Sequence, residues 1–277
     1  MSKQKNWFVT GAGRGFGREF ATAALERGDR VTATARRKDT LRDLADRYGE
    51  ALLPLPLDVT DRAEAQAAVD AAVERFGALD VVVNNAGYGL FGAVEEITDQ
   101  QLRDQLEVNL FGAFHVTQAV LPILRKQGAG HIIQISTISG IASFPNLGGY
   151  SASKWALEGL SEALAQEVAG FGIKVTLVEP GQFATDWAGS SAVHADPLPE
   201  YDSLRARFDK QQSAMPAKFI GDPKGVGPAL LEVVDAEEPP LRVLFGAMPT
   251  SLVPFLYEQR LQTWKQWEPV ALTANGH

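Results

Sequence analysis

The chain contains no cysteine among its 277 residues, which excludes disulfide bonds and thiolate catalysis. Basic residues are outnumbered, with 26 Lys and Arg against 34 Asp and Glu, and no basic run exceeds Arg36-Arg37-Lys38. Nucleic acid is therefore not an expected partner. The four histidines lack the i, i+4 pairing of metal ligands, and no G-x-S-x-G motif occurs, so neither a metal site nor hydrolase chemistry is expected.

Long apolar runs are absent as well. No segment approaches the roughly 18 uninterrupted apolar residues that a membrane span needs. The first predicted strand begins so early that we expect no signal peptide before it. These features predict a cytoplasmic protein with no membrane segment. Because 45% of the residues are hydrophobic, the chain can still build the core of one α/β domain.

Apolar, β-rich runs alternate with amphipathic segments along most of the chain. The predicted strands are Trp7–Thr10, Arg30–Ala35, Leu52–Leu57, Val81–Asn84, His131–Ser136, Lys174–Glu179 and Arg242–Phe245. The predicted helices are Gly15–Arg27, Thr40–Tyr48, Arg62–Phe76, Gln100–Leu124 and Ser151–Ala169. This order predicts a single doubly wound Rossmann-type domain, with a parallel sheet of about seven strands and helices on both faces. Its ligand site should lie at the carboxyl ends of the strands.

Two regions fall outside this alternation. Residues 182–225 carry several prolines and no regular periodicity, which predicts a long insertion that covers the substrate. Residues 250–268 form an aromatic tail, which we expect to pack over the same end of the sheet or against a neighbouring subunit.

A glycine-rich turn follows the first predicted strand and leads directly into a helix. Glycines allow a tight turn and let backbone N–H groups approach a pyrophosphate at the helix N-terminus. An ordinary strand-to-helix turn is the alternative, but the position after the first strand of an α/β pattern favours a dinucleotide. The predicted binding residues of this turn are Gly11, Gly13, Arg14, Gly15, Phe16 and Gly17.

The end of the second predicted strand indicates which dinucleotide binds. Ala35 stands where an NAD-selective site would place Asp or Glu, and Arg36 and Arg37 follow it. Guanidinium groups form charge-assisted bonds with a 2′-phosphate, which a carboxylate would repel. Arg14 can approach the same phosphate from the other side. The alternative is that all three are solvated surface arginines. We expect NADP(H) as the cofactor and consider NAD(H) a weaker candidate.

Tyr150 and Lys154 are one helical turn apart near the start of the helix after the fifth predicted strand. Residues at i and i+4 share a helix face, so both side chains can point into one site. A nearby lysine cation favours the phenolate form, which prepares a tyrosine to donate or remove a proton. A Y-x-x-x-K pair also arises by chance, so this spacing alone leaves a purely structural explanation open.

Taken with the other motifs, the sequence resembles the short-chain dehydrogenase/reductase family over nearly the full chain. The matching stretches are Thr10–Gly17, Asp58-Val59, Asn84-Asn85-Ala86-Gly87, Asn109, Ile135–Gly140, Tyr150–Lys154 and Pro180-Gly181 through Thr185. The resemblance implies an oxidoreductase that acts on small molecules. It also implies a homodimer or homotetramer in which the helices 100–124 and 151–169 pair between subunits.

The resemblance further implies a role for each matching residue. Tyr150 would be the general acid and base, Lys154 would hold the nicotinamide ribose and lower the tyrosine pKa, and Asn109 would support the helix and a proton-relay water. The other implied cofactor contacts are Asp58 and Val59 at the adenine, Asn85, Ala86 and Gly87 along the groove, and Pro180, Gly181, Phe183 and Thr185 at the nicotinamide end.

One position departs from the family pattern. The family usually has a serine thirteen residues before the tyrosine, where it binds the substrate oxygen, and this chain has Thr137 there. Threonine offers the same hydroxyl, but its methyl group stiffens the side chain and crowds the pocket. We expect Thr137 to take the role of the serine. Ser136 should face the other side of the strand, and Ser139 remains an alternative further into the loop.

Aromatic and aliphatic residues are expected around the reacting carbon, which predicts an apolar ketone or secondary alcohol as substrate. The predicted substrate contacts are Tyr88, Leu90, Phe91, Phe144 and Trp187, with core packing as the alternative for Phe91 and Phe144. The predicted function is therefore an NADP(H)-dependent carbonyl reductase or alcohol dehydrogenase. An NADP(H)-binding sensor or scaffold with the same fold and little activity is the alternative.

Overall fold

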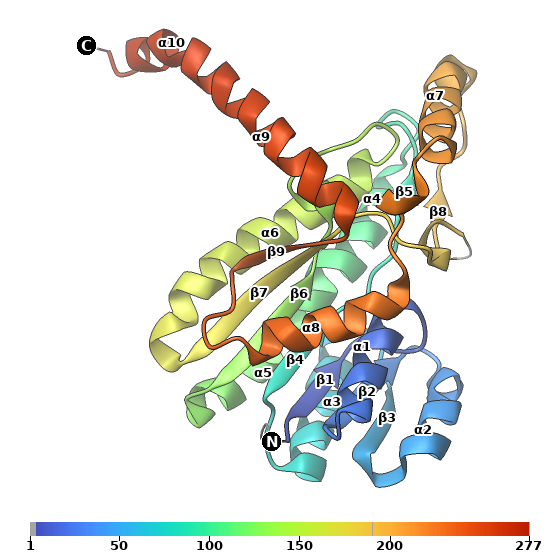
Figure 1. Cartoon of the computed structure of the whole chain (residues 1–277), viewed down its shortest axis with the longest axis vertical. Coiled ribbons are helices and arrows are strands. Elements are labelled where there is room, and N and C mark those ends of the chain that lie inside the picture. Colours follow the sequence, from blue (N-terminus) through green and yellow to red (C-terminus); the bar gives the residue numbers. More distant parts are fainter. Residues whose placement is uncertain (1–3, 190, 277) are drawn as a thin grey trace.

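The structure is a computed structural model that describes residues 4–189 and 191–276. Seven strands of these residues form one parallel sheet in the order β3-β2-β1-β4-β6-β7-β9 (Figure 1), which confirms the doubly wound fold. The strands are β1 (Asn6–Val9), β2 (Arg30–Ala35), β3 (Leu52–Pro56), β4 (Val81–Asn84), β6 (Gly130–Ile135), β7 (Ile173–Pro180) and β9 (Arg242–Phe245). The strand order reverses between β1 and β4, so a crevice is expected at their carboxyl ends.

Helices cover both faces of this sheet (Figure 1). The α-helices of the described residues are α1 (Gly15–Glu26), α2 (Arg42–Tyr48), α3 (Arg62–Phe76), α4 (Asp99–Leu106), α5 (Gly112–Gln127), α6 (Gly148–Val168), α7 (Asp202–Ser213), α8 (Val226–Asp235), α9 (Ala247–Gln266) and α10 (Glu268–Thr273). None of the helices in the described residues is long and apolar enough to cross a membrane.

The sheet separates two hydrophobic cores, because neighbouring residues of a strand point to opposite faces. On β1, Trp7 and Val9 join the core formed with α1, α2 and α8, whereas Phe8 joins the core formed with α3, α5 and α6. All three side chains are fully buried. Each large apolar side chain that is buried contributes about 1.5–3 kcal/mol to the stability of the fold. The helices on both faces of the sheet therefore stabilise it, because each layer buries its own set of such side chains.

The predicted helix over Gln100–Leu124 is continuous in the structure but contains a π-helical turn, which divides it into α4 and α5. A capping box between Thr98 and Gln101 starts α4. A π-helical turn over Glu107–Phe111 then separates α4 from α5 and contains Asn109. Turns of this kind are frequent at functional sites. The apolar periodicity continues through the turn, which explains why the sequence pattern did not reveal it.

The two irregular regions contain more structure than the sequence pattern indicated. Within residues 182–225 lie helix α7 and a short strand, β8 (Val193–His194), which pairs with β5 (Leu90–Phe91). The aromatic tail lies in α9, which follows β9 and extends away from the sheet (Figure 1). Pro249, the buried residue of α9, lies just before this tail, and no residue of 250–268 is buried, so the structure does not bear out the packing of the tail over the end of the sheet.

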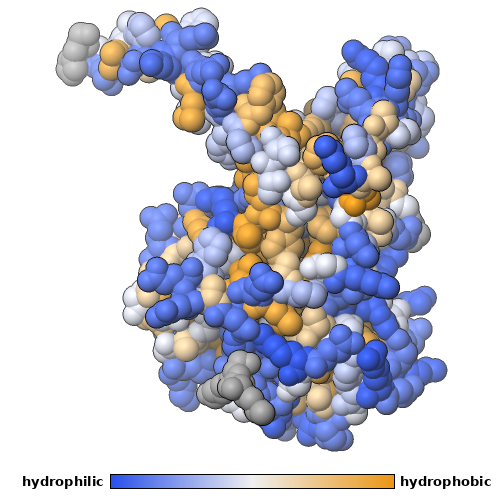
Figure 2. Space-filling view, viewed as in Figure 1, coloured by the Kyte–Doolittle hydropathy of each residue, from blue (hydrophilic) through white to orange (hydrophobic). Residues whose placement is uncertain are grey.

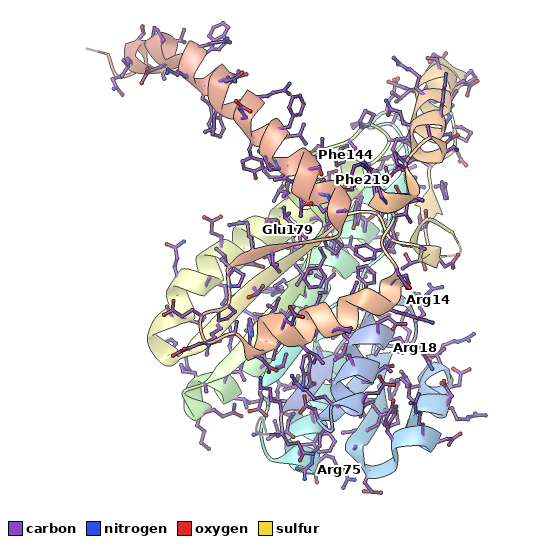
Figure 3. The ribbon with its side chains drawn as sticks, viewed as in Figure 1. Arg14, Arg18, Arg75, Phe144, Glu179 and Phe219 are labelled. Carbon is purple, nitrogen blue, oxygen red and sulfur yellow. The ribbon has the colours of Figure 1, made fainter. Side chains whose placement is uncertain are left out.

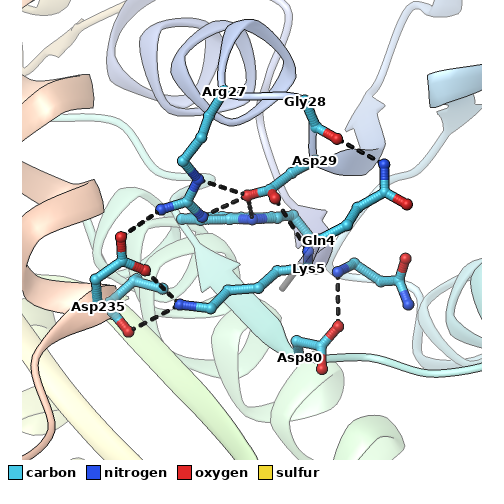
Figure 4. Close-up of polar contacts among 10 residues, drawn as sticks. Gln4, Lys5, Arg27, Gly28, Asp29, Asp80 and Asp235 are labelled. Carbon is cyan, nitrogen blue, oxygen red and sulfur yellow. Dashed lines mark hydrogen bonds and ion pairs between the residues drawn. The ribbon is translucent and has the colours of Figure 1, made fainter. Parts of the chain in front are cut away.

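The amino ends of the central strands are held by a polar network around Asp29 (Figure 4). The Asp29 carboxylate accepts hydrogen bonds from Trp7 Nε1 at 2.8 Å, from the Lys5 backbone N–H at 3.0 Å and from Arg27 Nε at 3.0 Å. Arg27 and Lys5 also pair with Asp235 at the end of α8. The network joins β1, the α1–β2 turn and α8 at the end of the sheet opposite the carboxyl-end crevice.

Replacement of Asp29 with alanine should lower the free energy of unfolding by about 3 kcal/mol. Asp29 is 3% exposed, so the change leaves the buried Trp7 N–H and Arg27 without their acceptor. Chemical denaturation monitored by circular dichroism measures the loss. Asp46→Ala, at an exposed carboxylate of α2, is the control and should change stability by less than about 0.5 kcal/mol. Equal effects of the two substitutions would contradict the role of the network.

Candidate active site

The glycine turn lies at the carboxyl end of β1, where the strand order reverses. Gly11 and Gly15 have φ angles of +66° and +56°, a backbone conformation that side chains other than glycine rarely adopt. Gly17 approaches the turn so closely that a Cβ would lie 2.5 Å from the carbonyl oxygen of Gly11. No atom lies within 4 Å of a Cβ placed on Gly15, so the turn leaves open space above the start of α1. Such a turn can hold a phosphate against the helix N-terminus.

Asn85 and Ala86 connect this turn to β4. Thr10 Oγ1 accepts hydrogen bonds from the backbone N–H groups of Asn85 at 2.9 Å and Ala86 at 3.0 Å. Asn85 Nδ2 donates to the carbonyl oxygens of Thr10 and Gly11 at 2.9 and 3.2 Å. The predicted groove residues therefore fix the shape of the glycine turn, a role that the sequence motif did not specify.

The three arginines predicted to bind a 2′-phosphate surround the same crevice edge. Arg36 and Arg37 follow β2 and are exposed, and Arg37 Nε lies 3.6 Å from Asp39. Arg14 is exposed beside α1 (Figure 3), and its Nη1 lies 3.8 Å from a carboxylate oxygen of Asp186. Both side chains of that pair are more than half exposed, so the pair is weak and reaches across the crevice entrance.

The predicted adenine residues lie beyond β3. Asp58 is exposed, and its carboxylate accepts hydrogen bonds from the N–H and hydroxyl of Thr60 at 3.0 and 2.8 Å. Val59 is 7% exposed and packs against Gly112, while its carbonyl oxygen contacts His115 Nδ1 at 3.1 Å. Val59 thus anchors the loop to α5 and leaves the Asp58 side chain at the surface of the crevice.

The four predicted catalytic residues meet at the carboxyl ends of β4, β6 and β7. Lys154 Nζ donates to the carbonyl oxygen of Ile135 at 2.8 Å. Asn109 Nδ2 donates to Ser153 Oγ at 3.1 Å, and Ser153 Oγ donates to the Tyr150 carbonyl oxygen at 2.7 Å. The π-helical turn at Asn109 is therefore bonded directly to the helix that carries Tyr150 and Lys154.

Asn109 also fixes the loop after β4. Its Oδ1 accepts from the Tyr88 N–H and its Nδ2 donates to the Tyr88 carbonyl oxygen, both at 3.0 Å. A Cβ on Gly87 would lie 3.0 Å from Asn109 Oδ1 and 3.6 Å from Lys154 Nζ. Gly87 therefore leaves room next to the lysine where a bound ligand could approach.

Thr137 follows β6, and its hydroxyl lies close enough to Tyr150 to lower the pKa of the phenol against the effect of burial. Its hydroxyl also donates to the Pro180 carbonyl oxygen and accepts from the Ser139 N–H, both at 3.3 Å. Ser136 points towards Gly140 and Glu158 instead. A Cβ added to Gly140 would lie 2.5 Å from Ser136 Oγ and 3.3 Å from Glu158 Oε1. Of the three neighbouring hydroxyl residues, Thr137 is the one that acts on the pKa of Tyr150.

The residues predicted at the nicotinamide end follow β7. Gly181 N–H donates to the Phe245 carbonyl oxygen at 3.0 Å, and Thr185 N–H donates to the Phe183 carbonyl oxygen at 2.8 Å. The Phe183 ring packs edge-on against Phe16 of the glycine turn, with ring centroids 4.9 Å apart. The segment after Pro180 is thereby held against the start of α1.

An aromatic cluster covers Tyr150. The Trp187 ring lies 4.9 Å from the Tyr150 ring and 5.3 Å from Phe91, measured between centroids. Phe144, Leu147 and Phe208 belong to the same cluster, and no sequence signal indicated Leu147 or Phe208. Leu90 does not join it: its side chain is fully buried and lies beside Gly149, Ile97 and Leu102. Its neighbour Phe91 occupies the cluster side of β5.

A buried carboxylate holds the insertion against this cluster. Glu96 accepts hydrogen bonds from the N–H groups of Ala93 at 2.7 Å and Leu198 at 2.8 Å, and it pairs with Arg205 of α7. The bond from the Leu198 N–H is the main cause that lowers the pKa of Glu96. The tyrosine Tyr201 adds a hydrogen bond to Glu95 at 2.7 Å.

Burial and charge set the proton affinities at the site. Tyr150 is 6% exposed, and burial raises its pKa, while the hydrogen bond with Thr137 acts in the opposite direction. Burial lowers the pKa of Lys154 from 10.5 to about 8, and the charge of Glu158 opposes this shift. Lys154 is thus a cation below about pH 8 and increasingly neutral above it.

The sequence interpretation missed a charge cluster one turn below Lys154. Arg242 of β9 lies 3.0 Å from Glu158, 2.8 Å from Glu162 and 3.5 Å from Glu179. Glu179 is buried at the end of β7 (Figure 3), and burial raises its pKa to about 8, with the charge of Glu158 adding to the effect. Glu158, in direct contact with the guanidinium, is then the carboxylate that faces Lys154.

The comparisons with known proteins agree with this geometry. The family profile described as short chain dehydrogenase matches residues 5–195. The chain is 44% identical to the oxidoreductase BOA17 of Botryotinia fuckeliana, over 87% of this chain and 89% of that protein. It is 35% identical to the 3-ketodihydrosphingosine reductase of Bacteroides thetaiotaomicron, over 87% of each chain. The chain belongs to the short-chain dehydrogenase/reductase family, whose members are oxidoreductases.

Solved structures show the same fold. A short-chain dehydrogenase from Streptomyces avermitilis matches with a TM-score of 0.91 and 39% identity, covering 99% of this chain and all of that one. A short-chain dehydrogenase/reductase from Burkholderia phymatum in complex with NAD matches with a TM-score of 0.80 and 28% identity, over 94% and 95%. An alcohol dehydrogenase from Thermococcus sibiricus complexed with 5-hydroxy-NADP matches with a TM-score of 0.74 and 25% identity, over 88% and 97%.

The ammonium of Lys154 should titrate near pH 8, as followed by NMR of ¹³C-labelled lysine with Lys154→Arg to assign the signal. Glu158→Gln should move this pKa further down, because the carboxylate that favours the cation is removed. Glu162→Gln is the matched control, since Glu162 also binds Arg242 but lies one turn further away, with an exposed side chain. A Lys154 pKa that both substitutions leave unchanged would refute the electrostatic role of Glu158.

Proposed function

We propose that this protein is an NADP(H)-dependent reductase of apolar ketones that also oxidises the corresponding secondary alcohols. The observation that carries the proposal is the meeting of Tyr150, Lys154, Thr137 and Asn109 beside an open glycine turn. This arrangement supplies a proton donor, a cation and a hydroxyl next to a place for a dinucleotide. All four are requirements of hydride transfer to a carbonyl group.

The open space over Gly15 and beside Gly87 fits a dinucleotide laid across the carboxyl ends of β1 and β4. When bound, the reduced nicotinamide supplies the hydride. Thr137 would hold the carbonyl oxygen next to the Tyr150 hydroxyl, and Tyr150 would give its proton to that oxygen as the alcohol forms. Lys154 would stabilise the resulting phenolate, which regains a proton from solvent.

Preference for NADP(H) is supported by the charges at the end of β2. Ala35 leaves no carboxylate to repel a 2′-phosphate, and Arg36 and Arg37 are exposed next to it. Arg14 lies across the crevice, and its weak pair with Asp186 can exchange for a phosphate. NAD and NADP analogues both occur among the similar structures, so this local charge pattern is the basis of the assignment.

The substrate class follows from the aromatic cluster over Tyr150. Trp187 packs against the phenol, Phe91 and Phe144 belong to the same cluster, and Glu96, which pairs with Arg205 of the insertion, is buried. Such a wall favours an apolar group next to the carbonyl. The insertion over residues 182–225 would then act as the cover that admits the substrate.

Tyr150→Phe should lower kcat/KM for ketone reduction by about 10²- to 10⁴-fold and leave the Kd for NADPH nearly unchanged, because only the proton donor is removed. Absorbance of NADPH during turnover with a panel of apolar ketones measures the rate, and NADPH fluorescence measures the Kd.

Thr137→Ala should lower kcat/KM for the same ketones about 10²-fold, and Ser139→Ala is the matched control that stays active. Full activity of Thr137→Ala together with an inactive Ser139→Ala would indicate that Ser139, and not Thr137, binds the substrate oxygen. Tight NADPH binding without turnover on any ketone would favour a sensor.

The double substitution Arg36→Asp, Arg37→Ala should weaken NADPH binding about 10- to 100-fold more than NADH binding, since charge-assisted bonds to the 2′-phosphate are lost. Isothermal titration calorimetry with both cofactors gives the ratio. Arg42→Ala, at an exposed arginine that begins α2, is the control and should leave the ratio unchanged. Equal weakening of NADPH and NADH binding in the double variant would contradict the assignment of Arg36 and Arg37 to the 2′-phosphate.

A further inference from the structure

Gln105, in the last turn of α4, is the one buried residue of that helix in the described chain. Hydrophilic residues otherwise make up most of the face of the molecule in Figure 2. Its Nε2 donates a hydrogen bond to the Tyr88 carbonyl oxygen at 3.0 Å, whereas its Oε1 has no hydrogen-bond partner among the described residues. A buried polar atom without a partner lowers stability, so an apolar side chain of the same shape would stabilise the fold at least as well. The burial of this amide therefore indicates a role for its N–H group other than packing.

Two side-chain amides share the Tyr88 carbonyl oxygen. Asn109 Nδ2 donates to it at 3.0 Å, as does Gln105 Nε2, so both lone pairs of the oxygen accept a hydrogen bond. Gln105 belongs to the regular end of α4, whereas Asn109 belongs to the π-helical turn Glu107–Phe111. One peptide therefore joins the regular helix to the widened turn. The Asn109 amide also donates to Ser153 Oγ at 3.1 Å, so its orientation has to satisfy acceptors on two sides.

The Tyr88 peptide lies in the middle of the loop between β4 and β5. On one side of it, the Ala86 N–H donates to Thr10 Oγ1 at 3.0 Å. On the other side, the Gly89 carbonyl oxygen accepts a hydrogen bond from the Val193 N–H at 2.9 Å. Between Ala86 and Gly89, the hydrogen bonds within the described part of the chain fall on Tyr88. The two amides that bind this peptide therefore fix the stretch between those anchor points.

The same stretch borders both Lys154 and the aromatic cluster. A Cβ on Gly87 would lie 3.0 Å from Asn109 Oδ1 and 3.6 Å from Lys154 Nζ, so the backbone at Gly87 passes close to both side chains. A Cβ on Gly89 would lie 2.6 Å from the ring of Trp187. A shift of this stretch would therefore change the space beside the lysine and the contact with the cluster together.

We propose that Gln105 is a positioning residue, which shares the Tyr88 carbonyl oxygen with Asn109 and thereby sets the gap between Gly87 and Lys154. The inference rests on the proposed function, because that gap is where a cofactor would approach the lysine. Asn109 alone would hold the peptide with an amide that is also bonded to α6. The second donor, from Gln105, keeps the peptide in the plane in which Asn109 can bind its N–H and its carbonyl oxygen at once.

The first test compares Gln105→Met with Gln134→Met, because methionine has nearly the shape of glutamine but donates no hydrogen bond. Gln134 is a matched control: it is 1% exposed, its Nε2 donates to Thr117 Oγ1 at 3.2 Å, and its Oε1 has no partner among the described residues. Gln105→Met should lower kcat for ketone reduction about tenfold and keep KM within about twofold, because positioning is lost and substrate binding is not. Its melting temperature, followed by circular dichroism, should stay the same or rise. Parent-like kcat in Gln105→Met, or equal losses of kcat in both variants, would overturn the proposal.

The second test is a double-mutant cycle between Gln105→Met and Asn109→Ala, with kcat/KM for ketone reduction as the measured quantity. Both residues act on one peptide, so their effects should not multiply. The double variant should be within about threefold of the slower single variant. A double variant whose loss equals the product of the two single losses would overturn the proposal, because Gln105 would then act independently of Asn109.

The third test needs no substrate. Hydrogen exchange, followed by mass spectrometry on a peptide that contains Tyr88, reports how firmly Asn109 Oδ1 holds the Tyr88 N–H. Gln105→Met should speed this exchange at least about tenfold, and Gln134→Met should leave it unchanged. Unchanged exchange in Gln105→Met would overturn the proposal. The expected change in exchange, in a protein whose parent chain reduces no ketone, would contradict the proposed function and still support the position of Gln105.

Discussion

The ammonium of Lys154 lies in the protein interior, bonded to the Ile135 carbonyl oxygen at 2.8 Å, and a buried cation tolerates few arrangements around it. The carbonyl is available because β6 ends there, and the helix register then places Tyr150 one turn earlier and Glu158 one turn later. Asn109, in the π-helical turn between α4 and α5, is bonded to the same helix through Ser153. One buried charge thus connects the end of β6 to α6.

Much of the fold could be predicted from the sequence because each signal is local. The seven strands of the sheet are apolar runs, and the glycine turn and the Tyr150–Lys154 spacing are contained in a few consecutive residues. The division between α4 and α5 was missed for the opposite reason. A π-helical turn adds one residue to the backbone period, and the apolar pattern is too coarse to register that difference.

The charge cluster below Lys154 illustrates what no local pattern contains. Glu158, Glu179 and Arg242 come from three separate elements, and they meet only because β9 pairs with β7 at the edge of the sheet. Seen in the sequence, Arg242 is an ordinary charged residue at the start of a strand. Similarly, Phe208 joins the aromatic cluster through the folding of the insertion, which has no periodicity to interpret. Long-range pairing decides such contacts, so they require the structure.

The ring of Trp187 lies against that of Tyr150, and the phenol is 6% exposed. The indole therefore forms a wall beside the phenol, and any molecule that reaches the hydroxyl has to fit next to it. The parallel pairing of β5 with β8 and the buried Glu96 hold this wall at two points. The shape of a fixed aromatic surface, rather than a charge, thus limits which molecules fit beside Tyr150.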